Sequence, residues 1–234
     1  MSIIETTGPA GIEIPQQITG RVEKVAVERD TYLRYAAAER VNHWTVAICA
    51  ILLTLSGLAF FHPSLFFLTD LFGGGAMART LHPWIGVVLA ITFTYMGVKF
   101  FRQNIWRTSD TEWLMQIDAV IGHHEERIPE AGRFNAAQKI IYYVMFWSVI
   151  TLFISGLLIW HQYFGASVPM VWQRAAVVFH ALTAVVMIAT MIIHIYAAIW
   201  NRGSVRAMTQ GPVTGGWLWK HHRRWLRELV ARKP

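Results

Sequence analysis

The chain has 234 residues, of which 54% are hydrophobic and only 15% are charged, and its formal net charge is +7. This balance excludes an ordinary soluble globular domain and is typical of a membrane protein. The single cysteine, Cys49, excludes an internal disulfide bond.

The first 40 residues are polar and carry charges of both signs. They contain no apolar stretch of the kind found in a cleavable signal peptide. We therefore expect residues 1–40 to form a cytoplasmic N-terminal arm that contacts a partner subunit or remains loose.

Four apolar stretches follow, each near the roughly 20 residues that an α-helix needs to cross a bilayer. They cover residues 43–61, 82–101, 140–160 and 175–200. The sequence therefore predicts an all-α membrane protein with four transmembrane helices in an up-down-up-down bundle. We expect this membrane domain to span residues 41–202, followed by a basic cytoplasmic C-terminal tail, residues 203–234.

Lysine and arginine are distributed unevenly among the segments that flank these stretches. Arg79 and Arg174 stand alone in the first and third loops, whereas the other segments outside the stretches are rich in basic residues. The positive-inside rule places both termini and the middle loop in the cytoplasm. The basic charge thus indicates topology and lipid contact, and it does not indicate a nucleic-acid partner.

Two short phrases repeat along the chain. The Ser-Gly-Leu phrase at 56–58 recurs at 155–157, and His82 with its small neighbours is matched by His180. We interpret the repeat as two helical hairpins in parallel orientation, with chance similarity between apolar segments as the alternative. The glycines in these phrases would let another helix or a flat cofactor approach closely, and ordinary helix packing is the alternative use for each.

Two histidines of the fourth stretch, His180 and His194, are 14 residues apart. On an α-helix this spacing is a rise of roughly 21 Å and nearly four full turns. Both side chains therefore leave the same side of one helix, near opposite faces of the bilayer. An ionisable side chain within a membrane span marks a functional site by default. Two histidines stacked in this way indicate axial ligands of two b-type haems.

Depth in the membrane gives each of these histidines a partner. His82 lies near the outer face, as His180 does, and His43 lies near the cytoplasmic face, as His194 does. We therefore expect His82 and His180 to bind an outer haem iron, and His43 and His194 to bind an inner one. Two histidine ligands leave no open position on the iron, which suits electron transfer. The chain has no Cys-x-x-Cys-His motif, so any haem is held non-covalently.

The remaining histidines have simpler interpretations. His62 and His161, at the outer ends of the first and third stretches, compete for the outer iron, although their neighbours indicate that they point into loops. The histidine pairs at 123–124 and 221–222 lie in charged segments, where we expect contact with solvent, lipid or a partner. The sequence also has no Walker loop, no Gly-x-Ser-x-Gly and no Cys-x-x-Cys zinc pair.

Several phrases together resemble the cytochrome b (gamma) subunit of membrane-bound respiratory formate dehydrogenase, over about residues 30–230. Their order and spacing make the match specific. They are Arg40-Val-Asn-His43-Trp-Thr, Leu81-His82-Pro83, Phe134-Asn-Ala-Ala-Gln138-Lys139, Val178-Phe-His180-Ala, Ile193-His194-Ile-Tyr-Ala-Ala-Ile-Trp200 and Lys220-His-His-Arg-Arg-Trp225.

The resemblance implies a division of labour in a bacterial inner-membrane complex. A molybdenum- or tungsten-containing catalytic (alpha) subunit would oxidise formate on the outer side, and an iron–sulfur (beta) subunit would relay the electrons. This chain would bind two b haems and carry no formate-oxidising site. The family's outer-haem ligands match His82 and His180, and its inner-haem ligands match His43 and His194.

The resemblance also implies a quinone acceptor near the cytoplasmic face. Asn135 and Gln138 match positions that line the family's quinone pocket, at the depth of His194. Capping of the third helix by Asn135 is the alternative interpretation of this segment.

Two other functions stay open at this point. A cytochrome b of a nickel–iron hydrogenase or of another respiratory oxidoreductase would share the four-helix, two-haem plan. A haem-free membrane anchor or small transporter would carry the same apolar stretches without haem. Acidic residues are missing from the interiors of the spans, which argues against a carboxylate proton relay.

The charge asymmetry makes the topology testable with fused reporters. We expect a periplasm-active reporter inserted at Gly74 to be active, because the first loop faces outward. The same reporter fused to the C-terminus should stay silent. The opposite pattern would reverse the direction of electron flow expected for this chain.

Overall fold

The computed structural model describes residues 30–122 and 128–231. Most of the arm expected over residues 1–40 therefore lies outside the described residues, as do His123 and His124. The described chain forms two compact units, and each is treated by itself.

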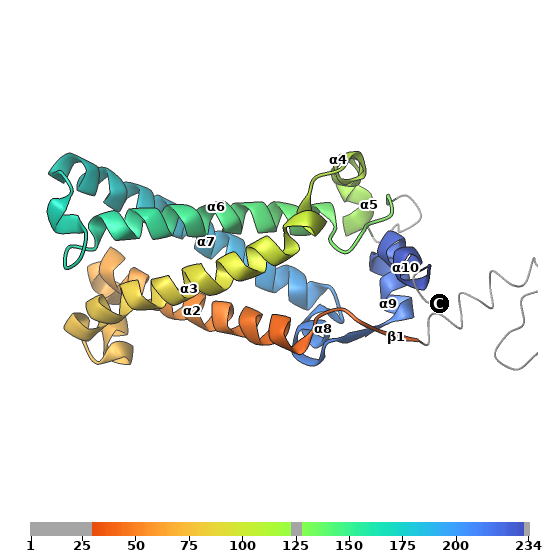
Figure 1. Ribbon diagram of the computed structural model, residues 1–234, viewed down its shortest axis with the longest axis horizontal. Helices are drawn as coiled ribbons and strands as arrows, with labels where there is room; N and C mark the ends of the chain where they lie inside the picture. The colour runs from red at the N-terminus through yellow and green to blue at the C-terminus, as the bar shows by residue number, and fades with distance from the viewer. Residues whose placement is uncertain (1–29, 123–127, 232–234) are drawn as a thin grey trace, which may run out of the picture. The chain divides into compact units, whose positions relative to one another are not determined.

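The first of these, the membrane unit, covers residues 36–106 and 136–205 and is dominated by four long apolar helices. These are α2 (Ala37–Phe61), α3 (Gly75–Asn104), α6 (Ala136–Ile159) and α7 (Met170–Trp200) (Figure 1). Each is 24 to 31 residues long, and its most apolar 18 residues have a mean hydropathy of 1.6 to 2.4, which is sufficient to cross a membrane. The expectation of four membrane-spanning helices is confirmed.

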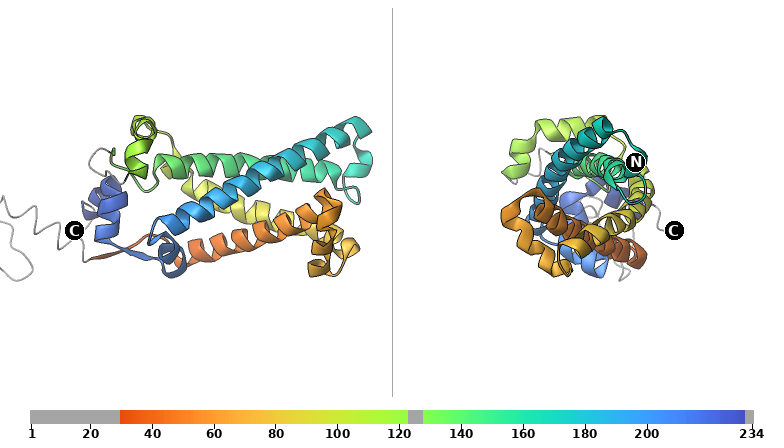
Figure 2. Two further views of the ribbon diagram at one scale, coloured as in Figure 1. Left: turned by 180° about the vertical axis from the view of Figure 1, so that it is seen from behind. Right: turned by 90° about the vertical axis from the view of Figure 1, so that its left-hand side faces the viewer.

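The four helices pack as two hairpins. Helix α2 packs against α3, and α6 packs against α7, while α3 also packs against α6 (Figure 2). Successive helices run in opposite directions, which is the expected up-down-up-down bundle. Because both hairpins begin at the same end of the bundle, their parallel orientation agrees with the internal repeat of the sequence.

A cluster of apolar side chains fills the middle of this bundle. Only 17% to 28% of the residues in the most apolar window of each helix are buried, because lipid solvates the outward faces of the helices. The buried members of the cluster are Val46, Cys49, Ala50, Leu89, Phe93 and Val149.

The hairpins approach each other most closely where α3 meets α6. The position that a Cβ would occupy on Gly97 lies 3.2 Å from the ring of Phe146. The hydroxyl of Tyr142 donates a 2.8 Å hydrogen bond to the Gly97 carbonyl, and that of Tyr143 donates one of 2.8 Å to the Asn104 carbonyl. Small residues at such crossings let helix backbones approach and pack in lipid.

Short 3₁₀ helices join the helices at the far end of the hairpins. The helix η1 (Pro63–Phe72) follows α2, and η3 (Gly165–Ser167) precedes α7. Gly73 and Gly74 have φ angles of +84° and +95°, a backbone conformation that glycine adopts without steric cost. These two residues turn the chain from η1 into α3.

The second unit, the strand unit, combines residues 30–35, 107–122, 128–135 and 206–231. Strand β1 (Thr31–Leu33) pairs antiparallel with β2 (Pro212–Thr214), with Tyr32 opposite Val213. Its buried core contains Tyr32, Ala207, Val213, Leu218, Trp225 and Leu226. The short helices of the described chain are α4 (Thr108–Met115), α5 (Ile117–Ile121), α8 (Ser204–Gln210), α9 (Gly215–His221) and α10 (Arg223–Val230).

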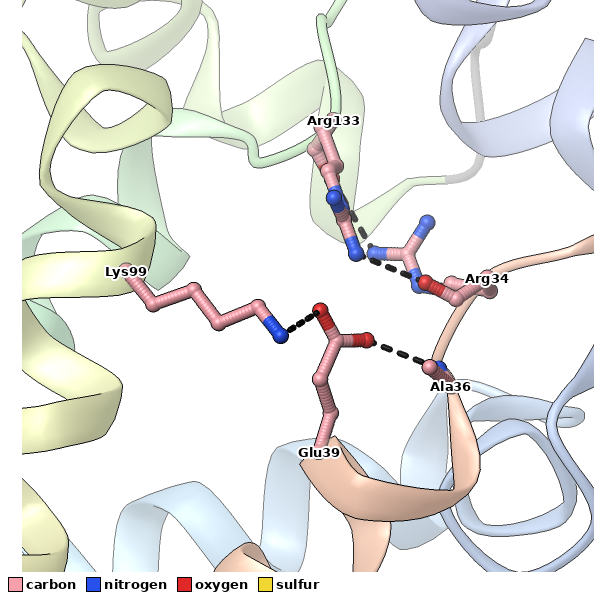
Figure 3. A network of polar contacts seen from close by, with 5 residues as sticks. All are labelled: Arg34, Ala36, Glu39, Lys99 and Arg133. Atoms are coloured by element: carbon pink, nitrogen blue, oxygen red, sulfur yellow. Dashed lines mark hydrogen bonds and ion pairs between the residues drawn. The ribbon is translucent and has the colours of Figure 1, made fainter.

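Two arginines of the strand unit bind each other's backbone. Arg34 donates to the carbonyl of Arg133 at 3.1 Å, and Arg133 donates to the carbonyl of Arg34 at 2.7 Å (Figure 3). Both guanidinium groups also lie over the ring of Trp225. The reciprocal bonds tie two segments of the unit that are far apart in sequence.

The expectation that His222 meets solvent, lipid or a partner is wrong, because the residue is fully buried inside the strand unit. Its Nδ1 lies 2.7 Å from the carbonyl of Gly132, and its ring lies against Trp217. Burial and the nearby Arg34 guanidinium hold the pKa of His222 well below its ordinary value. The ring is therefore neutral, and Nδ1–H donates to the carbonyl.

The contact between Gly97 and Phe146 predicts a stability effect. We expect Gly97→Leu to destabilise the membrane unit by about 1–3 kcal/mol, because the added side chain overpacks the crossing of α3 and α6. Thermal unfolding in detergent, followed by circular dichroism, measures the change. Val98→Leu is the control, since Val98 is 69% exposed. Equal melting temperatures for the two variants would contradict the packing described here.

Candidate functional site

Four histidines of the membrane unit meet as two pairs. The rings of His82 and His180 have centroids 6.3 Å apart and planes tilted by 59°. The rings of His43 and His194 have centroids 6.2 Å apart and planes tilted by 49°. All four are half-buried. The structure thus brings together the same histidines that membrane depth pairs in the sequence.

Helix α7 supplies one member of each pair. His180 faces His82 near the start of α3, and His194 faces His43 near the start of α2. Because α2 and α3 are antiparallel, their starts lie at opposite ends of the bundle. The two pairs therefore stand at opposite ends of the membrane unit and join the first hairpin to the second.

A serine supports each histidine of the His82–His180 pair. The Oγ of Ser56 lies 2.7 Å from Nδ1 of His82, and the Oγ of Ser155 lies 2.9 Å from Nδ1 of His180. Sequence reasoning missed both contacts. The repeated Ser-Gly-Leu phrase was the signal that could have revealed them, since both serines belong to it.

The glycines of the same phrase leave space beside these rings. A Cβ on Gly57 would lie 3.6 Å from Cε1 of His82, and one on Gly156 would lie 3.5 Å from Cε1 of His180. A larger side chain at either position would therefore press against an imidazole. At the other pair, Nδ1 of His43 is buried and has no hydrogen-bond partner within the described residues.

The donor set limits what these pairs can hold. Within residues 30–122 and 128–231, no group of three or more His, Cys, Asp or Glu side chains could hold a metal ion. Structural zinc sites need four protein ligands, and catalytic ones need three. Two facing imidazoles supply only two ligands, which is what a metal already held by a flat tetradentate ring requires.

The competing histidines lie apart from these pairs. His62 and His161 are exposed at the ends of α2 and α6. Nδ1 of His62 accepts a hydrogen bond from the backbone N–H of Ser64 at 3.2 Å, which fixes the ring in the loop. This agrees with the expectation that both side chains point into loops.

An ion pair between a buried carboxylate and an exposed lysine lies one turn before His43. Glu39 accepts a 2.8 Å hydrogen bond from the backbone N–H of Ala36, and its other oxygen lies 3.2 Å from Nζ of Lys99 (Figure 3). The carboxylate is therefore paired and also caps the first turn of α2. This pair places two opposite charges at the His43–His194 end of the bundle.

The residues expected to line a quinone pocket belong to the start of α6. Gln138 lies in its first turn and Asn135 immediately precedes the helix, and both are half-buried. Because α6 runs antiparallel to the neighbouring α7, Gln138 lies at the same end of the bundle as His194. Next to it, Lys139 is buried and donates a 2.9 Å hydrogen bond to the Ile105 carbonyl.

Comparison with known protein families and proteins shows which family the chain resembles. A family described as prokaryotic cytochrome b561 matches residues 34–211, which include all four paired histidines.

Three curated proteins illustrate the similarity. The cytochrome b556(fdo) subunit of formate dehydrogenase from Escherichia coli is 38% identical, over 86% of this chain and 94% of its own length. The cytochrome b556(Fdn) subunit of the nitrate-inducible formate dehydrogenase from the same organism is 37% identical, over 82% and 88%. The formate dehydrogenase cytochrome b556 subunit of Haemophilus influenzae is 32% identical, over 91% and 90%.

Proposed function

Because the chain belongs to the prokaryotic cytochrome b561 family, we propose that it is the two-haem cytochrome b subunit of a membrane-bound formate dehydrogenase. In this role it anchors the complex and carries electrons across the membrane to quinone. The single observation that carries the proposal is the meeting of four histidines as two ring pairs at opposite ends of the bundle.

The spacing within each pair fits a shared metal ion. A bond between a metal and an imidazole nitrogen is about 2.0–2.1 Å long, and the ring centre lies roughly 1 Å behind that nitrogen. Two imidazoles on opposite sides of one ion therefore have centres about 6 Å apart. A direct hydrogen bond between the rings would bring the centres to about 5 Å. The observed centroid distances of 6.2 and 6.3 Å support the first arrangement.

Each histidine would then have one role, as a ligand of a haem iron. His82 and His180 would hold one haem, and His43 and His194 would hold the other. When bound, a b haem with two imidazole ligands supplies a one-electron couple and offers no open position for oxygen or substrate. The protein contributes the rigid helices that fix the distance between the pairs and the apolar core that excludes water between them.

The partners follow from the names of the relatives. Each is the cytochrome subunit of a formate dehydrogenase. A cytochrome subunit of such an enzyme would work with a subunit that oxidises formate and with one that relays the electrons. The family resemblance implies that the first contains molybdenum or tungsten and that the second is an iron–sulfur subunit. The positive-inside rule places the His82–His180 end of the bundle on the periplasmic side of a bacterial inner membrane. These subunits would therefore contact the chain at that end.

Quinone reduction belongs to the opposite end of the bundle. Gln138, Asn135 and the second ring nitrogen of His194 would offer hydrogen bonds to a quinone carbonyl. A metal-bound histidine normally donates its second N–H to some acceptor, so a quinone oxygen is a suitable partner. Reduction there would take up protons from the cytoplasm while formate is oxidised outside, which builds a proton-motive force without a proton channel.

The similarity to formate dehydrogenase subunits favours this assignment over the cytochrome b of a nickel–iron hydrogenase, whose plan of helices and haems is the same. A haem-free anchor or transporter would have no use for four half-buried histidines that face one another at metal-ligand spacing. An absorption spectrum of the reduced, purified complex separates the haem-free alternative at once.

We expect two haems per chain and selective loss when a ligand is removed. A pyridine haemochrome assay should give a haem-to-chain ratio of two for the wild-type chain and one for His82→Ala or His43→Ala. His82→Ala should block electron entry from formate, and His43→Ala should block electron exit to quinone. His161→Ala is the control and should keep both haems. Loss of a haem in this control, or a wild-type ratio of one, would refute the pairing.

The proposed quinone site gives a separate prediction. Gln138→Leu should keep both haems reducible by formate and slow their reoxidation by added quinone about fivefold, since one hydrogen bond contributes about 1 kcal/mol. Asn135→Ala should act in the same way. Stopped-flow absorption measures the reoxidation rate. Gln162→Leu, at an exposed loop position, is the control. Unchanged reoxidation in both test variants would place quinone elsewhere and leave Asn135 as a helix cap.

A further inference from the structure

We propose that Ser56 and Ser155 are positioning residues, which fix the proton of His82 and His180 on Nδ1 and lower the midpoint potential of the haem held by this pair. The inference rests on the proposed function, because it needs a metal bound to the opposite nitrogens of the two rings. Its evidence is a pair of hydrogen-bond networks that the structure repeats in the two hairpins.

The number of available protons decides whether Ser56 or His82 donates the hydrogen bond between them. The Oγ of Ser56 lies 2.8 Å from the carbonyl of Leu52 and 3.3 Å from that of Leu53. A hydroxyl has one proton and a carbonyl has none, so both contacts can be hydrogen bonds only if the Ser56 proton points to the backbone. The Oγ then has only lone pairs left for His82, 2.7 Å away, and the ring must donate Nδ1–H.

The second hairpin repeats this arrangement. The Oγ of Ser155 lies 2.6 Å from the carbonyl of Thr151 and 3.3 Å from that of Leu152. Its proton is committed to the backbone as well, so Oγ accepts Nδ1–H from His180 at 2.9 Å. In both rings the proton is on Nδ1, and the lone pair of Nε2 is free to bind a metal.

These bonds also change the ligand's electronic character. A histidine that donates its second N–H becomes a more basic ligand, and such outer partners typically change metal affinity by about 10- to 100-fold. A more basic ligand stabilises the oxidised, more positive haem more than the reduced one. The two serines therefore lower the midpoint potential of the haem at this end.

The other pair has no matching support at His43. Its Nδ1 is buried without a hydrogen-bond partner among the described residues. The serine hydrogen bonds that would lower the midpoint potential are therefore present at both histidines of the His82–His180 pair. His43 has no such bond among the described residues. A lower potential at the His82–His180 haem would favour electron transfer from it toward the haem of His43 and His194.

The test is a redox titration of the intact complex, in which the two haems are resolved by absorption and by electron paramagnetic resonance. Ser56→Ala and Ser155→Ala should each raise the midpoint potential of the His82–His180 haem. We expect its reduction equilibrium constant to rise about tenfold, which for one electron is about 59 mV. The haem bound by His43 and His194 should not shift.

Two further variants separate the hydroxyl from its surroundings. Ser155→Thr keeps the hydroxyl and should retain the wild-type potential. Ser148→Ala removes another serine of α6 that is as buried as Ser155, at 5% exposure, and should leave both potentials unchanged. If Ser155→Ala loses the haem and Ser155→Thr keeps it, the inference is also supported, because the hydroxyl then decides ligand geometry.

The inference is overturned if both alanine variants retain the wild-type potentials, or if Ser155→Thr loses the haem as Ser155→Ala does. Failure of the proposed function would look different. In that case the wild-type complex itself would lack the haem that His82→Ala removes, and no potential would be available to shift.

Discussion

The arrangement of this structure centres on pairs of imidazoles that face each other, one from each helical hairpin. Helix α7 presents His180 and His194 toward the first hairpin, where they meet His82 and His43. Because one rigid helix carries both residues, the spacing along it sets the distance between the two pairs. In the proposed function this spacing would be the length of the electron path, and the apolar side chains packed between α2, α3 and α6 would line it.

Lipid determines how the remaining polar groups are arranged. Polar groups inside the membrane unit have no bulk water to bind, which favours hydrogen bonds to their own or a neighbouring helix. Serine and threonine hydroxyls donate to carbonyls one turn back, as Ser56, Ser155 and Thr190 do. At Ser56 and Ser155 the hydroxyl oxygen keeps its lone pairs, and His82 and His180 lie within hydrogen-bond distance of them.

The spans and the pairing of histidines could be predicted from the sequence, because hydropathy and helical spacing are local properties. The contacts of Ser56 and Ser155 were missed, since a serine inside a span usually bonds only to its own helix and the repeated Ser-Gly-Leu phrase was the one signal that pointed to them. The burial of His222 was also missed, because Gly132, its acceptor, is distant in sequence and charged neighbours make the segment look solvated. The position of Gln138 at the same end of the bundle as His194 could be predicted from the order of the helices along the chain.

The pairing of β1 with β2 has a consequence for how the chain enters the membrane. Residues 31–33 precede the first span and residues 212–214 follow the fourth, so the strands can meet only if both lie on one side of the bilayer. An even number of crossings satisfies this condition, and an odd number violates it. A chain in which one helix fails to insert therefore separates β1 from β2 and exposes the apolar core they cover. The small sheet can thus form only in a chain whose helices have crossed the bilayer an even number of times.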